Sequence, residues 1–344
     1  MMEQEVRRQA EEAKAASYTL AALQTNVRNT ALDAMAEALT LHADTILREN
    51  TADVEEAQKS GIRASYLDRL RLDESRIAAM AEGLRLIAAL PDPLGREDYS
   101  VRRPNGLEIR RMRVPLGVVG MIYEARPNVT ADAVGLCLKS GNAVLLRGGS
   151  DALRSNRAIA DVLSRAAYAV GIPTGAIQLL AMKDRAAVDV MTRLTGLLDV
   201  IIPRGGRSLI ERISAEAKVP VIKHLDGVCH TYVDEPCDED LALKVADNAK
   251  TQKYSPCNAT ETLLVARGVA ASFLPRMAAI YAAKGVLMRC DAESLALLEK
   301  WRQSLPPGQP QPQLAAAQEE DWRAEYLAPI IAIKVVAGLD EAMA

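Results

Sequence analysis

The sequence is poor in aromatic residues, histidine and cysteine, and each scarcity excludes something. Aromatic side chains make up 3% of the 344 residues, so the core must be mostly aliphatic. Three histidines and five scattered cysteines, without a CxxC pair, provide neither a zinc constellation nor a disulfide framework. The GxGxxG fingerprint of dinucleotide-binding turns is also missing.

Charge and hydropathy exclude two further classes of partner. The net charge is −3, from 42 basic and 45 acidic side chains, which argues against a nucleic acid or an anionic membrane surface. No apolar run is long enough to cross a bilayer, and residues 1–16 lack the hydrophobic segment of a signal peptide. We therefore expect a cytoplasmic protein, and the length suggests about two domains.

Residues 1–90 have the periodicity of amphipathic helices. One apolar stripe at helical spacing precedes Pro91, which is expected to end its helix. The stripe consists of Ile77, Met80, Ala81, Leu84, Ile87 and Ala88. Thr30 and Asp33 have the spacing of a capping box, which predicts the start of another helix at Thr30.

After Pro115, short apolar runs alternate with helical stretches, which predicts a parallel α/β sheet. Strands are predicted at 118–123, 143–146, 176–180, 197–202 and 219–222, and helices at 129–139 and 155–170. Residues 230–265 begin a second set of elements, which includes the late apolar run 330–336. The preceding charged segment 99–113 contains Asn105–Gly106, which predicts a hairpin with a two-residue turn.

Two of the predicted strands run into glycine-rich turns that are followed by helices. The first turn is Arg147–Gly148–Gly149–Ser150, and the second contains Arg204, Gly205 and Gly206. Such a turn leaves backbone N–H groups available for phosphate, and the arginines add positive charge. Tight turns in α/β proteins need glycine in any case, so the turns alone leave a purely structural role open.

Cys257 lies in a polar loop, ahead of an apolar run at 263–265 that predicts a strand. Pro256 and Asn258 discourage regular structure around the thiol. Lys250 and Lys253 bring positive charge close in sequence, and nearby cations favour the reactive thiolate form. The spacing alone also fits an ordinary cysteine without a chemical role.

Four long stretches resemble the γ-glutamyl phosphate reductase family, whose fold is aldehyde-dehydrogenase-like. They are KTQKYSPCNATETLLV (250–265), the block 114–156, VPVIKHLDGVCHTYVD (219–234) and DWRAEYLAPIIAIKVV (321–336). An Arg-Pro pair usually stands in that family where Lys253 and Tyr254 stand here. Family chains usually continue past residue 344, so the resemblance implies that a C-terminal block is missing.

The resemblance implies an α/β architecture in three parts. A Rossmann-type parallel-sheet domain that binds the cofactor would comprise residues 1–98 and 114–229. Residues 99–113 would form a small oligomerisation arm, which the basic composition alone would also fit as a solvated segment. An α/β catalytic domain, incomplete at its C-terminus, would comprise residues 230–344.

The resemblance also implies roles for individual residues. Cys257 would be the nucleophile and Asn128 the oxyanion donor. The glycine-rich turns would bind NADPH, with Arg147 beside Ser150 suited to a 2′-phosphate, and Glu325 would hold the nicotinamide ribose. His224 stands where hydrolytic relatives carry a glutamate base, which suits release to phosphate, although a histidine without a role remains open. Cys229 and His230 are not expected to form a dyad, because adjacent strand residues point in opposite directions.

The implied activity is that of an NADP-dependent, phosphorylating glutamate-5-semialdehyde dehydrogenase of proline biosynthesis, which reduces L-glutamyl 5-phosphate. The implied partners are further copies of the chain, in a homo-oligomer, and glutamate 5-kinase as the source of the substrate. Two alternatives stay open: another aldehyde dehydrogenase or acyl-CoA reductase, and an inactive truncated homologue that serves in association. With the C-terminal block missing, we expect cofactor binding to persist and turnover to be low or absent.

Overall fold

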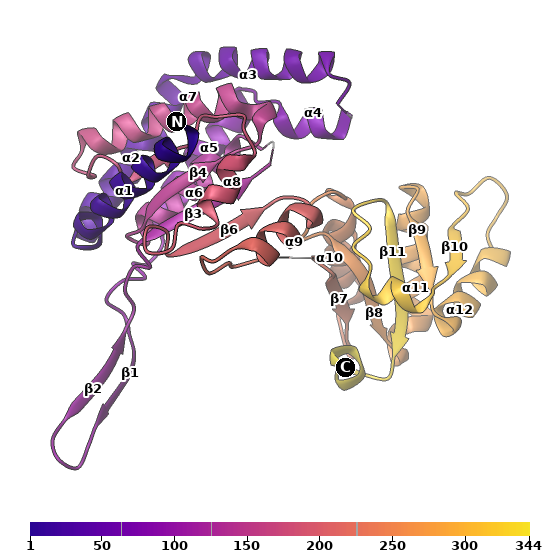
Figure 1. The fold of residues 1–344 in the computed structure, drawn as a ribbon. Coiled ribbons are helices and arrows are strands. Elements are labelled where there is room, and N and C mark those ends of the chain that lie inside the picture. Colours follow the sequence, from indigo (N-terminus) through magenta and orange to yellow (C-terminus); the bar gives the residue numbers. More distant parts are fainter. Residues whose placement is uncertain (63, 125, 225) are drawn as a thin grey trace. The chain divides into compact units, whose positions relative to one another are not determined.

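The computed structural model describes residues 1–62, 64–124, 126–224 and 226–344. The chain forms two compact units, a first unit of Met1–His224 and a second unit of Leu225–Ala344 (Figure 1). This division falls close to the predicted boundary after residue 229, and the predicted arm lies within the first unit. Among the described residues, no helix is both long enough and apolar enough to cross a membrane.

Helices make up the N-terminal part of the first unit, as the periodicity predicts. They are α1 (Met2–Ala21), α2 (Thr25–Leu41), α3 (Ala43–Lys59), α4 (Ala64–Leu70) and α5 (Glu74–Ala89). In α5, Ile77, Met80 and Leu84 of the predicted stripe are buried in the core, and the helix ends before Pro91.

The predicted helix start at Thr30 is wrong. Helix α2 begins at Thr25, and Thr30 is an exposed residue in its interior. The Thr25 hydroxyl and the Arg28 guanidinium both bind the carboxylate of Asp92, at 2.6 Å from Arg28 Nη2. Arg28 Nη1 also donates to the carbonyl of Lys139 (3.1 Å). These partners are distant in sequence, so a capping pattern, which compares only residues three positions apart, contains no information about them.

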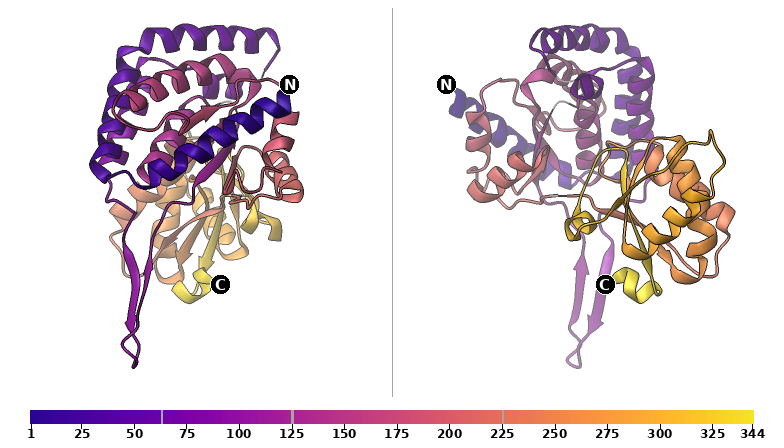
Figure 2. Two further views of the ribbon diagram at one scale, coloured as in Figure 1. Left: turned by 60° about the vertical axis from the view of Figure 1, so that its left-hand side comes forward. Right: turned by 90° about the vertical axis from the view of Figure 1, so that its right-hand side faces the viewer.

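The segment after α5 is a hairpin of β1 (Glu97–Arg102) and β2 (Glu108–Met112), paired antiparallel. Both views in Figure 2 place it clear of the helices of its own unit. The turn has three residues, not two, because Arg103 N–H donates to the Leu107 carbonyl (2.8 Å) and encloses residues 104–106. Pro104 has no N–H for the strand ladder, and Gly106 takes a φ of +85° that favours glycine.

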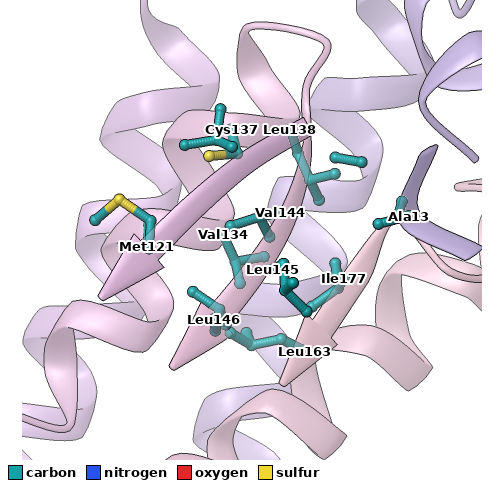
Figure 3. Close-up of a cluster of buried hydrophobic side chains, with 14 of the residues drawn as sticks. Ala13, Met121, Val134, Cys137, Leu138, Val144, Leu145, Leu146, Leu163 and Ile177 are labelled. Atoms are coloured by element: carbon teal, nitrogen blue, oxygen red, sulfur yellow. The ribbon is translucent and has the colours of Figure 1, made fainter. Parts of the chain in front are cut away.

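The sheet of the first unit has four parallel strands in the order β5-β4-β3-β6. The strands are β3 (Val118–Tyr123), β4 (Ala143–Arg147), β5 (Ile177–Leu179) and β6 (Val200–Arg204). The associated helices are α6 (Asn128–Lys139), η1 (Ser150–Ala152), α7 (Leu153–Ala169), α8 (Ala186–Met191) and α9 (Arg207–Glu216). Figure 3 shows part of the core, where Val144, Leu145 and Leu146 of β4 meet side chains of neighbouring helices and of β5.

One predicted strand of this unit, at 219–222, does not form. Only a single bridge, Ile201 to Val221, joins this run to β6. Pro220 accepts a hydrogen bond from Ile201 N–H (2.8 Å) but has no N–H to donate, so it cannot contribute fully to a ladder.

The sheet of the second unit has five parallel strands in the order β10-β9-β11-β8-β7. The strands are β7 (Cys229–Val233), β8 (Thr260–Ala266), β9 (Leu287–Cys290), β10 (Gln313–Ala316) and β11 (Ile330–Val336). The helices are α10 (Glu239–Thr251), α11 (Arg267–Ala283), α12 (Ala292–Gln303), η2 (Glu319–Arg323) and α13 (Leu339–Met343). The predicted strand 330–336 is therefore confirmed as β11, and both of its edges are paired, with β8 and β9.

Candidate functional site

The predicted oxyanion donor and both predicted cofactor turns come after adjacent strands of the first unit. Asn128 follows β3, Gly148 follows β4, and Gly205 follows β6, in a sheet where these strands lie in the order β4-β3-β6. The chain runs from β3 outward to β4 and β5, and it returns to place β6 on the other side of β3. This is a topological switch point, where open α/β sheets bind ligands at the carboxyl ends of their strands.

Arg147, predicted to select NADPH, has its guanidinium turned inward. The residue is 7% exposed. Nη1 donates to the carbonyl of Gly148 (2.9 Å) and Nη2 to that of Lys183 (3.4 Å), while Nε is buried without a partner among the described residues. Burial lowers the pKa of the guanidinium from its ordinary value. The contact with a 2′-phosphate stays a prediction.

The backbone of Gly148 lies directly against helix α7. A Cβ at this position would come within 2.1 Å of Asn156 Nδ2, so only glycine fits. Asn156 Oδ1 accepts from the Thr130 hydroxyl (3.2 Å), which also pairs with the Tyr123 hydroxyl (2.7 Å). Asn156 Nδ2 and Arg147 Nε are buried and lack partners among the described residues. These unmatched N–H groups beside a glycine turn fit a cofactor that carries phosphates.

A groove of about 510 Å³ borders the same turn, between α3 and α7. Ser150, Arg154 and Lys183 line it, together with Glu56, which lies 2.9 Å from Lys183 Nζ. Sequence reasoning missed Lys183, which lies 33 residues or more from the first turn in sequence and belongs to no motif. Lys183 and Arg154 thus bring further cations to the groove that Ser150 lines, in the predicted 2′-phosphate region.

The second predicted turn, at the end of β6, is Gly205–Gly206. Arg204 itself is the last residue of β6, and its carbonyl accepts from Glu124 N–H (3.1 Å). A Cβ on Gly205 would come within 2.8 Å of the Glu124 side chain. Gly206 is the N-cap residue of α9, and no described side chain caps that helix. The first N–H groups of α9 are thus placed as a phosphate-binding turn requires.

Asn128, predicted to stabilise an oxyanion, is the exposed first residue of α6. Its Nδ2 donates to Asp132 Oδ2, one helical turn later, at 3.2 Å. Burial raises the pKa of Asp132 from its ordinary value. A primary amide has two N–H bonds, so one can orient the group on Asp132 while the other remains for a ligand. Sequence reasoning missed Asp132, although its spacing from Asn128 is the i, i+4 signal of a helical pair.

Cys257 belongs to the second unit and lies in the loop between α10 and β8. It is exposed, whereas β8 is buried along its whole length. Within the loop, Ala259 N–H donates to the carbonyl of Pro256 (3.1 Å), which forms a turn around the cysteine. Lys253 of the same loop is exposed. The structure thus holds an accessible thiol in a tight loop at the start of a buried strand.

Lys250, which the sequence places near the thiol, directs its charge elsewhere. Its side chain is fully buried, and Nζ lies 2.6 Å from Glu261 Oε2. Cys229 is a neighbour of Cys257, since its Sγ donates to the Cys257 carbonyl (3.5 Å). Sequence reasoning missed this contact. His230 Nδ1 pairs instead with the Val228 carbonyl (2.8 Å), so the thiol of Cys229 and the ring of His230 have different partners.

Gly227 brings the Cys257 loop close to Glu325, the predicted ligand of the nicotinamide ribose. A Cβ on Gly227 would lie 2.3 Å from the carbonyl oxygen of Cys257 and 3.1 Å from Glu325 Oε1. Glu325 is half-buried in the segment between η2 and β11. Two predicted site residues of the second unit are therefore neighbours across a single glycine.

The remaining candidates have simpler surroundings. His224 is an exposed residue at the end of the first unit. Asn128 and the two glycine turns belong to the first unit, and Cys257 and Glu325 to the second. Across the described ranges, no cluster of three or more histidine, cysteine, aspartate or glutamate side chains is arranged to hold a metal ion.

We predict that Cys257 is alkylated faster than the other four cysteines. All five lie within the described residues, and Cys257 alone is exposed. Burial raises the pKa of Cys137 and of Cys290 to about 12, and burial with nearby acidic groups raises that of Cys237. Peptide mapping after limited iodoacetamide treatment measures the order, with Cys229 as the most informative internal comparison. Labelling of Cys229 ahead of Cys257 would contradict the prediction.

Comparisons with known proteins complete the description of the site. Residues 1–288 match the aldehyde dehydrogenase family. The γ-glutamyl phosphate reductase of Thermotoga maritima is 40% identical, with a TM-score of 0.83 over 98% of this chain and 78% of that chain. The γ-glutamyl phosphate reductase of Saccharomyces cerevisiae is 26% identical, with a TM-score of 0.60 over 98% and 82%. An acetylating aldehyde dehydrogenase of Geobacillus thermoglucosidasius is 20% identical, with a TM-score of 0.62 over 99% and 77%. The α/β fold expected from the resemblance is confirmed.

Proposed function

Because the chain belongs to the aldehyde dehydrogenase family, whose oxidoreductases use NAD or NADP, we propose that it reduces L-glutamyl 5-phosphate with NADPH. The products are L-glutamate 5-semialdehyde and phosphate. The reaction would be a step of proline biosynthesis and would take place in the cytoplasm. The observation that carries the proposal is the 40% identity, over 98% of the chain, with a γ-glutamyl phosphate reductase. The exposed Cys257 between α10 and β8 supports the same chemistry.

Cys257 supplies the nucleophile in this proposal. Its thiolate attacks the acyl carbon of the acyl phosphate, a carbon–sulfur bond forms, and the bond to the phosphate oxygen breaks. The glycine-rich turns after β4 and β6 would hold NADPH, which would supply the hydride for reduction of the resulting thioester. The hemithioacetal on Cys257 then collapses to the aldehyde and returns the thiolate. The covalent intermediate divides one difficult substitution into two easier steps.

Asn128 supplies the amide that stabilises the oxyanion in both tetrahedral species, together with the backbone N–H of Cys257. One N–H of the Asn128 amide donates to Asp132, which fixes the orientation of the group, and the second N–H is left for the substrate oxygen. Lys253, exposed in the Cys257 loop, and Arg126 are the proposed cations for the substrate phosphate and α-carboxylate.

The hairpin of β1 and β2 is proposed as the arm that joins copies of the chain in a homo-oligomer. Large apolar side chains are exposed along it, which is unusual for a strand pair that faces water alone. They are Tyr99, Leu107, Ile109 and Met112. Glutamate 5-kinase is the proposed source of the acyl phosphate.

The choice of NADPH over NADH gives a testable prediction about Arg147. A charge-assisted contact with the 2′-phosphate contributes about 1.5–3 kcal/mol, so Arg147→Ala is expected to weaken NADPH by about tenfold or more and to spare NADH. Because the guanidinium is buried, the readout is the ratio of the two dissociation constants, which cancels a general loss of stability. Lys183→Ala is the matched variant. An unchanged ratio in Arg147→Ala with a changed ratio in Lys183→Ala would transfer the role to Lys183.

The reaction itself is tested by its dependence on phosphate. With L-glutamate 5-semialdehyde and NADP, we expect reduction of NADP only when inorganic phosphate is present. In the forward direction, glutamate 5-kinase and ATP generate the acyl phosphate, and NADPH oxidation is followed. Phosphate-independent oxidation of the aldehyde would indicate a hydrolytic aldehyde dehydrogenase, and turnover of acyl-CoA alone would indicate an acyl-CoA reductase. Either result would reject the proposed substrate.

A further inference from the structure

A fully buried ion pair lies beneath the Cys257 loop. Lys250 Nζ and Glu261 Oε2 are 2.6 Å apart, and both side chains have no exposed surface. Burial lowers the pKa of Lys250, and the hydrogen bond that its ammonium donates to Glu261 opposes that shift. Two charges removed from water gain little net stability from one another, so stability alone does not explain the pair.

The pair joins the two ends of the loop that carries the nucleophile. Lys250 lies in the last turn of α10, and Glu261 is the second residue of β8. The chain leaves the helix after Thr251, passes through Cys257 and enters the strand at Thr260. A contact across the base of a loop limits the conformations of every residue between its ends.

The same carboxylate also holds the segment that carries Glu325. Glu261 Oε1 accepts from the backbone N–H of Leu327 at 3.1 Å. Leu327 has a φ of +50°. Among the described residues, it is the only non-glycine residue with a positive φ. Such a conformation is strained for leucine and persists where surrounding contacts impose it. Glu325 lies two residues before this bond in the sequence.

We infer that Glu261, held by Lys250, is a positioning residue that sets the Cys257 loop against the Glu325 segment. One oxygen of its carboxylate faces Lys250 at the base of the loop, and the other fixes the kink at Leu327. The loop and the segment then meet at Gly227, against Cys257 and Glu325. The catalytic part of this inference rests on the role proposed for Cys257.

Two double variants separate positioning from simple loss of charge. Both K250Q/E261Q and K250M/E261M remove the two charges, but only the glutamine pair keeps an oxygen that can accept from Leu327 N–H. We expect K250M/E261M to have at least about tenfold lower kcat than K250Q/E261Q. Hydrogen exchange of residues 324–329 is expected to be at least about tenfold faster in the methionine variant.

Asp92→Asn is the control, because it weakens another ion pair, with Arg28, in the first unit. It is expected to lower stability and to leave kcat unchanged. Equal kcat and equal exchange in the two double variants would overturn the inference, as would a fall in kcat of the same size in Asp92→Asn. A wild-type chain without turnover would leave the proposed function without support, and hydrogen exchange would still compare the two double variants. Faster exchange in the methionine variant would then support the structural link by itself.

Discussion

Replacing Cys257 by serine is expected to lower reductase turnover by at least about a thousandfold and to leave the affinity for NADPH unchanged. Serine has nearly the shape of cysteine, but its hydroxyl is a much weaker nucleophile without an adjacent base. Because the side chain is exposed, in a loop outside the buried core of the second unit, the substitution removes reactivity and not packing. Turnover of L-glutamyl 5-phosphate and an NADPH titration on the same sample measure both effects.

Cys237→Ser is the matched control for this substitution. Cys237 is a half-buried residue of the same unit, and it takes no part in the proposed chemistry. We expect its variant to keep the turnover of the wild type within about twofold. Turnover retained in Cys257→Ser would exclude the thioester mechanism.

Replacing Gly227 by alanine is expected to lower kcat by about a hundredfold. The added Cβ would stand 2.3 Å from the carbonyl oxygen of Cys257, which is a backbone atom and cannot move aside as a flexible side chain would. The loop that carries the nucleophile must therefore shift, and a misplacement of about 1 Å can cost about a hundredfold in rate. Steady-state kinetics measures kcat, and an NADPH titration on the same sample separates a loss of cofactor affinity from a loss of turnover.

Gly338→Ala controls for the loss of a glycine as such. No atom lies within 4 Å of a Cβ at this position, and its φ of 169° is extended backbone that alanine adopts freely. Its variant is expected to keep the wild-type kcat. If Gly227→Ala also kept it, the closeness of Gly227, Cys257 and Glu325 would have no catalytic consequence.

The regular elements of the fold were predictable because their signals are local. Residues 118–123 form one apolar run and are buried along the whole of β3, and the stripe at Ile77, Met80 and Leu84 faces the core. The misplaced start of α2 has the opposite cause. Arg28, in the first turn of α2, meets a carboxylate 64 residues away, and the helix already contains Thr30 in its interior.

The sequence supplies a set of candidate site residues but not the contacts that these residues make. Motif wording identified Cys257, Asn128 and the glycine turns, which the structure places at strand ends and loops. A sequence motif does not predict the direction in which a long side chain points. Lys250 is adjacent to the loop in sequence, yet its charge is buried against Glu261, whose other oxygen binds Leu327, 66 residues away. Arg147 likewise turns toward the carbonyl of its neighbour Gly148 and toward that of Lys183, which lies 36 residues away in sequence.

The most direct measurement is the capture of the acyl group on the chain. The protein is mixed with L-glutamyl 5-phosphate in the absence of NADPH, and intact mass, peptide mapping and released phosphate are recorded. Without the reductant, the reaction is expected to stop at the thioester. We expect about one γ-glutamyl group per chain, on the peptide that contains Cys257, with an equal amount of phosphate released above that of a protein-free control. Absence of the adduct from the wild-type chain, or an adduct that persists in Cys257→Ser, would contradict the thioester mechanism.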